Sequence, residues 1–113
     1  MSPGEFDELV EKALATIPAR FRKLLSNVVI VVEREPANPE LLGLHESNPP
    51  LPDKITIYQG PPERSARNRD ELFRLVQETV IHEIGHYFGM DELRVQRMER
   101  ARRKRLRKRR PLQ

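Results

Sequence analysis

The sequence predicts one small domain of the α+β class. Apolar residues recur at helical spacing within residues 6–17 and again within 73–88, which predicts two amphipathic helices. Between them, residues 28–32 and 54–59 are rich in Val, Ile and Thr and predict strands. The 113 residues suffice for a single core and leave no room for a second globular unit.

The first helix begins at a capping box. Ser2 is the expected N-cap, Pro3 occupies the first helical position, and Glu5 is placed to reach back to the cap. Pro18 ends or kinks this helix, and the apolar residues that follow suggest a further turn before Asn27.

The two predicted strands differ in pattern. Residues 28–32 are Val or Ile throughout, which favours a strand buried on both faces. Residues 54–59 alternate apolar with polar and predict a half-exposed strand that ends at Gly60-Pro61-Pro62. The connection between them, residues 35–53, is long and rich in proline, and leucines in its middle are expected to pack on the core as a short strand.

A long helix is predicted from a second capping-box pattern at Asn68 to a C-terminal stop at Gly89. Some 20 residues at about 1.5 Å each give roughly 30 Å, the width of a small domain. A last helix is expected to begin near Asp91 and to pack through Leu93 and Met98. We therefore divide the chain into a domain, residues 1–99, and a basic tail, residues 100–113.

Charge is distributed unevenly. Residues 94–110 contain eleven Lys or Arg and one acid, so the first 93 residues, with 10 basic and 16 acidic groups, are acidic. Cysteine is absent, which excludes disulfides and thiolate ligands. The apolar runs are too short to span a membrane, and the N-terminus lacks the pattern of a secretory signal, so we expect a cytoplasmic protein with no membrane contact.

His82-Glu83-Ile84-Gly85-His86 lies inside the long helix and forms the His-Glu-x-x-His pattern. Residues four apart project from the same face, so His82 and His86 can bind one metal ion. Glu83 is close enough to act on a metal-bound water without being a ligand. We expect these three polar groups to be buried, because the helix otherwise forms core.

The motif continues as His-Glu-x-x-His-x-x-Gly-x-x-Glu through Gly89 and Glu92. Together with residues 28–92, it resembles zincin metallopeptidases, and most closely a family of minimal bacterial zincin-like proteins. The resemblance implies a small domain with the long helix packed against a small sheet, one Zn²⁺ per chain, His82 and His86 as ligands, Glu83 as general base and Gly89 as the turn.

The resemblance leaves the third ligand open. The family prefers Asp followed by Glu at this position, whereas this chain has Glu92 there and Asp91 one residue earlier. We favour Glu92 by register and take Asp91 as the alternative, although Asp91 also suits the N-cap of the last helix. His45, carried by the proline-rich connection, is the third candidate.

The predicted reaction is peptide-bond hydrolysis by a metal-activated water. An extended peptide substrate is expected to pair with residues 54–59, as strands do at the edge of a zincin cleft, although these residues are equally compatible with a plain sheet edge. Tyr58, Tyr87 and His45 are candidates for contacts to the substrate or its oxyanion.

The alternative hypothesis is a non-catalytic binding module. It would retain the metal for structure and contact nucleic acid or another polyanion through residues 100–110, a basic run without aromatic residues for base stacking. A solvated or disordered tail, or one lying on its own acidic domain, explains the same charge pattern.

Overall fold

The computed structural model describes residues 1–89, 100–101 and 104. The predicted last helix, with Leu93 and Met98, and both carboxylates proposed as third ligands lie outside the described residues. So does most of the basic tail. In the described part of the chain, no helix is both long enough and apolar enough to cross a membrane.

A three-stranded mixed sheet forms one layer, with the order β1-β3-β2. Strand β3 (Asp53–Tyr58) lies in the centre and pairs in parallel with β1 (Val28–Glu33) and antiparallel with β2 (Gly43–Glu46). The middle of the proline-rich connection therefore forms the expected short strand.

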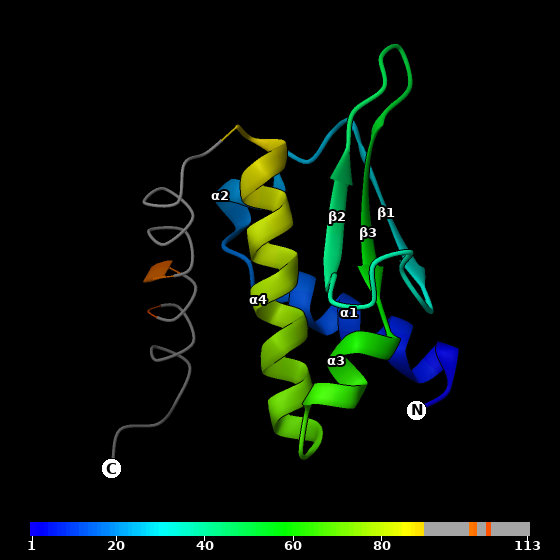
Figure 1. Cartoon of the computed structure of the whole chain (residues 1–113). Helices are drawn as coiled ribbons and strands as arrows, with labels where there is room; N and C mark the ends of the chain where they lie inside the picture. Colours follow the sequence, from blue (N-terminus) through cyan, green and yellow to red (C-terminus); the bar gives the residue numbers. More distant parts are fainter. Residues whose placement is uncertain (90–99, 102–103, 105–113) are drawn as a thin grey trace.

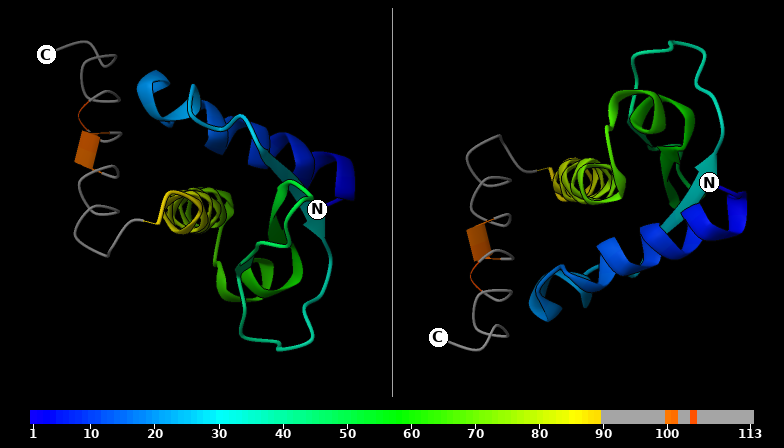
Figure 2. Two further views of the ribbon diagram at one scale, coloured as in Figure 1. Left: turned by 90° about the horizontal axis from the view of Figure 1, so that it is seen from above. Right: turned by 90° about the horizontal axis from the view of Figure 1, so that it is seen from below.

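Helices α1 (Pro3–Ala15) and α4 (Arg69–Tyr87) form the other layer. Figure 1 shows α4 standing beside β2, and the end-on views in Figure 2 show α1 crossing α4. The two long helices share one hydrophobic core with the sheet, formed by Phe6, Val10, Ala13, Ile17, Ile55, Ile57, Leu72, Val76, Val80, Ile81 and Ile84. This core fixes α4 against the sheet, and with it the motif.

Both predicted caps are present. The Ser2 side chain accepts a hydrogen bond from the Glu5 backbone N–H at 3.1 Å, and Glu5 accepts one from the Ser2 N–H at 3.2 Å. Asn68 caps α4 by accepting from the Glu71 N–H at 2.8 Å. Pro18 ends the first helix, and one further helical piece follows, α2 (Ala19–Arg22).

Two predictions about the strands were wrong. The apolar strand β1 is an edge strand with Val29 47% exposed, whereas β3, expected to be half-exposed, buries Thr56 to 1%. Thr56 lies in the central strand, between Val31 of β1 and Leu44 of β2 on the same face. The position of a strand in the sheet, rather than its own pattern, decided its burial.

The prediction that Gly60-Pro61-Pro62 simply ends the strand was also incomplete. These residues open a short helix, α3 (Gly60–Ser65), with prolines in its first turn, where the missing N–H is no loss. Helix α3 turns the chain from the end of β3 towards the start of α4 (Figure 1).

Candidate functional site

Helix α4 presents His82, Glu83 and His86 near its C-terminal end. The two imidazole rings lie one turn apart with centroids separated by 4.6 Å and planes at 78°. The neighbouring residues Val80, Ile81 and Ile84 are buried in the core and fix the rotation of the helix. The two rings are therefore held together on one side of α4, as a shared metal ion requires.

The motif is more open than the sequence predicted. His86 is exposed, and His82 and Glu83 are only partly buried, so the expectation that all three side chains are buried was wrong. The two histidines lie away from the core-forming residues of α4, whereas Glu83 lies at the border of the core face, against β2.

The end of the helix agrees with the predicted turn. Phe88 is the C-cap, and Gly89 follows with a φ of 66°, in the left-handed region that favours glycine. Its N–H donates to the His86 carbonyl at 2.9 Å. The helix therefore ends within three residues of the second histidine.

Strand β2 approaches α4 closely at Gly43. A Cβ atom at this position would stand 2.7 Å from Thr79 Cγ2 and 3.1 Å from Glu83 Cγ. Only glycine permits this separation, because real Cβ atoms do not approach other heavy atoms so closely. The strand therefore lies directly against the helical turn that carries Glu83.

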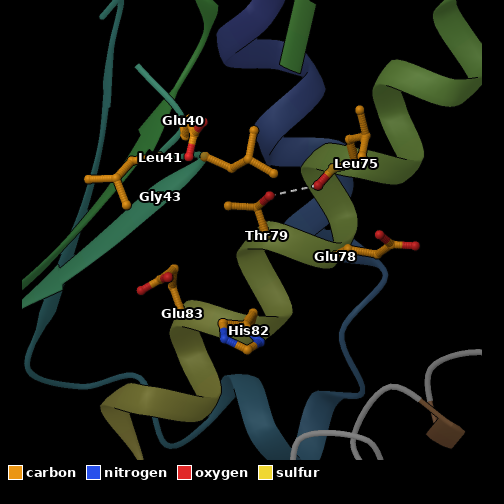
Figure 3. Close-up of a pocket in the computed structure, with 9 residues that line it drawn as sticks. Glu40, Leu41, Gly43, Leu75, Glu78, Thr79, His82 and Glu83 are labelled. Atoms are coloured by element: carbon orange, nitrogen blue, oxygen red, sulfur yellow. Dashed lines mark hydrogen bonds between the residues drawn. The ribbon is translucent and has the colours of Figure 1, made fainter. Parts of the chain in front are cut away.

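Two hollows flank this contact, and Glu83 lines both. The first, about 370 Å³, lies towards the start of α4 and is shown in Figure 3; its lining is Glu40, Leu41, Leu42, Gly43, Leu75, Glu78, Thr79, His82 and Glu83. The second, about 400 Å³, lies towards the end of α4 and is lined by Leu41, Gly43, Leu44, His45, Glu83 and His86. A ligand that extends along β2 would pass Glu83 between them.

His45 takes part in a polar arrangement of its own. Its Nε2 atom lies 2.8 Å from Asp53 Oδ2, and Ser47 Oγ donates to Asp53 Oδ1 at 3.0 Å. The hydrogen bond from His45, aided by that from Ser47, lowers the pKa of the Asp53 carboxyl against the opposing effect of burial. The ring of His45 also meets Tyr87 edge-on, with centroids 6.2 Å apart.

The structure thus places His45 on the wall of the second hollow with Nε2 directed at Asp53. No group of three His, Asp or Glu side chains within residues 1–89, 100–101 and 104 is arranged to hold a metal ion. Glu92 and Asp91 lie outside that part of the chain, so the third ligand stays a prediction.

The two tyrosines have different positions. Tyr87 lies next to the motif and packs between His45 and Phe88. Tyr58 follows Ile57, which faces the core, so it points to the opposite face of the sheet and lines neither hollow. It is 7% exposed, and burial raises the pKa of its hydroxyl. The structure does not bring Tyr58 to the motif.

The prediction that residues 54–59 form the edge of the substrate cleft was wrong. Residues 54–59 belong to the central strand, which is paired on both sides, and the edge beside the motif is β2. The Tyr58 N–H donates to the Leu42 carbonyl. This bond shows which residues of β2 direct their backbone groups towards β3. By alternation, the backbone N–H and C=O groups of Gly43 and His45 point away from β3, to the edge of β2 that is free of other strands among the described residues.

The comparisons with known proteins agree with this arrangement. Residues 25–102 match the sequence profile of a family described as zincin-like metallopeptidase. A similar solved structure is a conserved hypothetical protein from Thermo thermophilus, with a TM-score of 0.58 and 25% identity, over 78% of this chain and 94% of that one. No curated protein matches the chain.

Proposed function

This chain belongs to the zincin-like metallopeptidase family, and from that premise we propose that it is a zinc-dependent peptidase with Glu83 as its general base. One observation carries the proposal. The Glu83 side chain lies between the paired rings of His82 and His86 and a sheet edge, in the wall shared by two hollows.

The described donors fit zinc. Two imidazoles from successive turns, with centroids 4.6 Å apart and no thiolate in the sequence, suit a catalytic zinc site with two histidines and a carboxylate. Glu92 is the proposed third ligand, with Asp91 and then His45 as alternatives. When bound, zinc polarises the scissile carbonyl and lowers the pKa of its water towards about 7.

Glu83 is proposed to handle the proton. Its Cγ atom lies beside Gly43, and its carboxylate accepts the proton of the attacking water and donates it to the leaving amine. The partly buried position lets the carboxylate reach both water and substrate.

The free edge of β2 is proposed to bind the peptide. Gly43 and His45 offer backbone N–H and C=O groups to an extended segment, which gives affinity without sequence preference. Peptide side chains opposite Gly43 and His45 would point towards α4, because directly paired residues share a face. The scissile bond would then lie beside Glu83.

The test compares wild type with Glu83→Gln, and with Glu11→Gln, at an exposed position of α1, as control. We expect one zinc per chain in all three, and cleavage of a mixed peptide library by wild type and Glu11→Gln. Glu83→Gln should be slower by about 10²–10⁴-fold, the usual contribution of general-base catalysis. Zinc at unit stoichiometry without cleavage by any of the three would reject the peptidase proposal.

The charge pattern favours a second candidate function, a polyanion-binding module that uses residues 100–110 and keeps the metal for structure. Glu83 distinguishes the two candidates, because a structural zinc site has no use for an uncoordinated carboxylate beside the metal.

A further inference from the structure

Apart from His82 and Glu83, the lining of the hollow nearer the start of α4 has no role in the proposed reaction. Building on the proposed function, we propose that it is a specificity subsite that takes a lysine or arginine side chain of the peptide substrate, next to the scissile bond. This assigns to the peptidase a preference for cleavage beside basic residues.

The floor of the hollow is apolar. Leu41 extends from the segment before β2 towards Leu75 and Thr79 of α4 (Figure 3). Thr79 Oγ1 donates to the Leu75 carbonyl at 2.8 Å, so its hydroxyl is satisfied within the helix, and its methyl group faces Gly43. These groups offer a surface for methylene groups rather than for a polar head.

The hollow is continuous with the catalytic residues. His82 and Glu83 form its lower wall, about one helical turn from Thr79 (Figure 3). Gly43 packs closely against Thr79 and Glu83, so the hollow borders β2 beside the proposed base. A peptide on the free edge of β2 would therefore place a side chain in this hollow while its backbone passes Glu83.

The charge of the lining determines which side chain fits. Glu40 and Glu78 are exposed at the margin, Glu83 lies deeper, and the described lining contains no Lys or Arg. The Glu40 N–H donates to Asn38 Oδ1 at 3.1 Å, which orders this segment. Lysine and arginine combine an apolar stem with a cationic head, and so match an apolar floor with an acidic margin.

The test uses three peptides that differ at one residue beside the cleaved bond, with arginine, norleucine or glutamate there. We expect kcat/KM to fall in that order, with arginine ahead of norleucine by about fivefold, as two exposed carboxylates can supply. In the double variant Glu40→Gln/Glu78→Gln this ratio should approach one, while kcat/KM for norleucine is retained. Glu8→Gln/Glu11→Gln, at exposed positions of α1, is the control pair. Norleucine preferred by wild type, or a ratio that survives the double substitution, would overturn the subsite.

A second readout separates this inference from the proposed function. Methyl NMR signals of Leu41, Leu75 and Thr79 are followed in the metal-free protein during titration with the same peptides. If the zinc-loaded protein cuts no peptide, shifts that saturate with the arginine peptide but not with the glutamate peptide would support the subsite and reject the peptidase. Cleavage by the zinc-loaded protein without a preference for arginine, together with an absence of methyl shifts, would support the peptidase and reject the subsite.

Discussion

Gly43 and Glu83 are far apart in the sequence and meet at the contact between β2 and α4, where a Cβ atom on residue 43 would stand 3.1 Å from Glu83 Cγ. The same Cβ would stand 3.2 Å from the Thr56 carbonyl oxygen. Strand β2 can therefore lie this close to α4 and to the proposed base, Glu83, because residue 43 has no side chain.

Gly43→Ala tests this relationship. The added methyl must push β2 away from Thr79 and Glu83, which we expect to lower the free energy of unfolding by about 1–3 kcal/mol, as overpacking does. Peptide cleavage should fall as well, because the strand edge and Glu83 move apart. Urea unfolding and kcat/KM measure the two effects. Gly4→Ala in α1, where nothing lies within 4 Å of the new Cβ, is the control and should not destabilise the protein.

The metal ligands can be assigned by zinc competition with a chromophoric chelator. His82→Ala and His86→Ala should each weaken zinc binding by more than about 100-fold, beyond the loss typical of outer-shell partners. Glu92→Ala should do the same, and Asp91→Ala should have a small effect. The opposite result for the two carboxylates would transfer the third-ligand role to Asp91. Loss of zinc only in His45→Ala would transfer it to His45.

Asp53 predicts a pH dependence of stability. The hydrogen bond from His45 lowers the pKa of Asp53 in the folded chain. A carboxyl with a lowered folded pKa contributes stability that is present above its unfolded pKa of about 3.9 and is lost as pH falls through the folded pKa. The Tm of wild type should therefore exceed that of Asp53→Asn above about pH 5, with the gap closing towards acid.

Thermal unfolding from neutral pH to about pH 2 measures this difference in Tm, with Asp7→Asn, at an exposed position of α1, as control. A gap that is constant over the whole range, or that widens towards acid, would contradict the role of the His45–Asp53 hydrogen bond.

The sequence was informative wherever local chemistry decides structure. The Ser2 capping box, the cap at Asn68 and the turn at Gly89 depend on a few adjacent residues, and each was predicted correctly. The spacing of His82 and His86 follows from helix geometry alone. These features could be predicted without knowledge of any contact between residues far apart in the sequence.

Features that depend on residues far apart in the sequence could not be predicted. Thr56 is buried in the central strand, and its neighbours Val31 and Leu44 can be identified only once the strand order is known. His45 reaches Asp53 because the antiparallel register opposite Ile55 makes them diagonal neighbours. For the same reason, residues 54–59 were predicted to form a sheet edge, whereas the edge strand beside the motif is β2.

The N-cap of α4 should matter for stability and not for zinc. Asn68→Ala removes the acceptor for the Glu71 N–H, at an expected cost of about 1 kcal/mol. Asn68→Asp keeps an acceptor and should remain near wild type. Urea unfolding distinguishes the variants, and zinc affinity should be equal in both, because the motif lies near the other end of α4. A loss of zinc affinity in Asn68→Ala would show that the first turn positions the motif.

Truncation tests the proposal that the basic tail contacts polyanions. Residues 100–113 contain nine Lys or Arg and no acid, and deletion of residues 106–113 leaves five of them. Binding to single-stranded DNA should weaken in steps from the full chain to the partial deletion and then to deletion of residues 100–113. The dependence on salt should decrease in parallel, since each neutralised phosphate adds about −0.7 to the slope of log K against log salt for single strands. Equal slopes in all three proteins would place polyanion binding outside the tail. Unchanged peptidase activity after full deletion would show that the hydrolytic site does not need the tail.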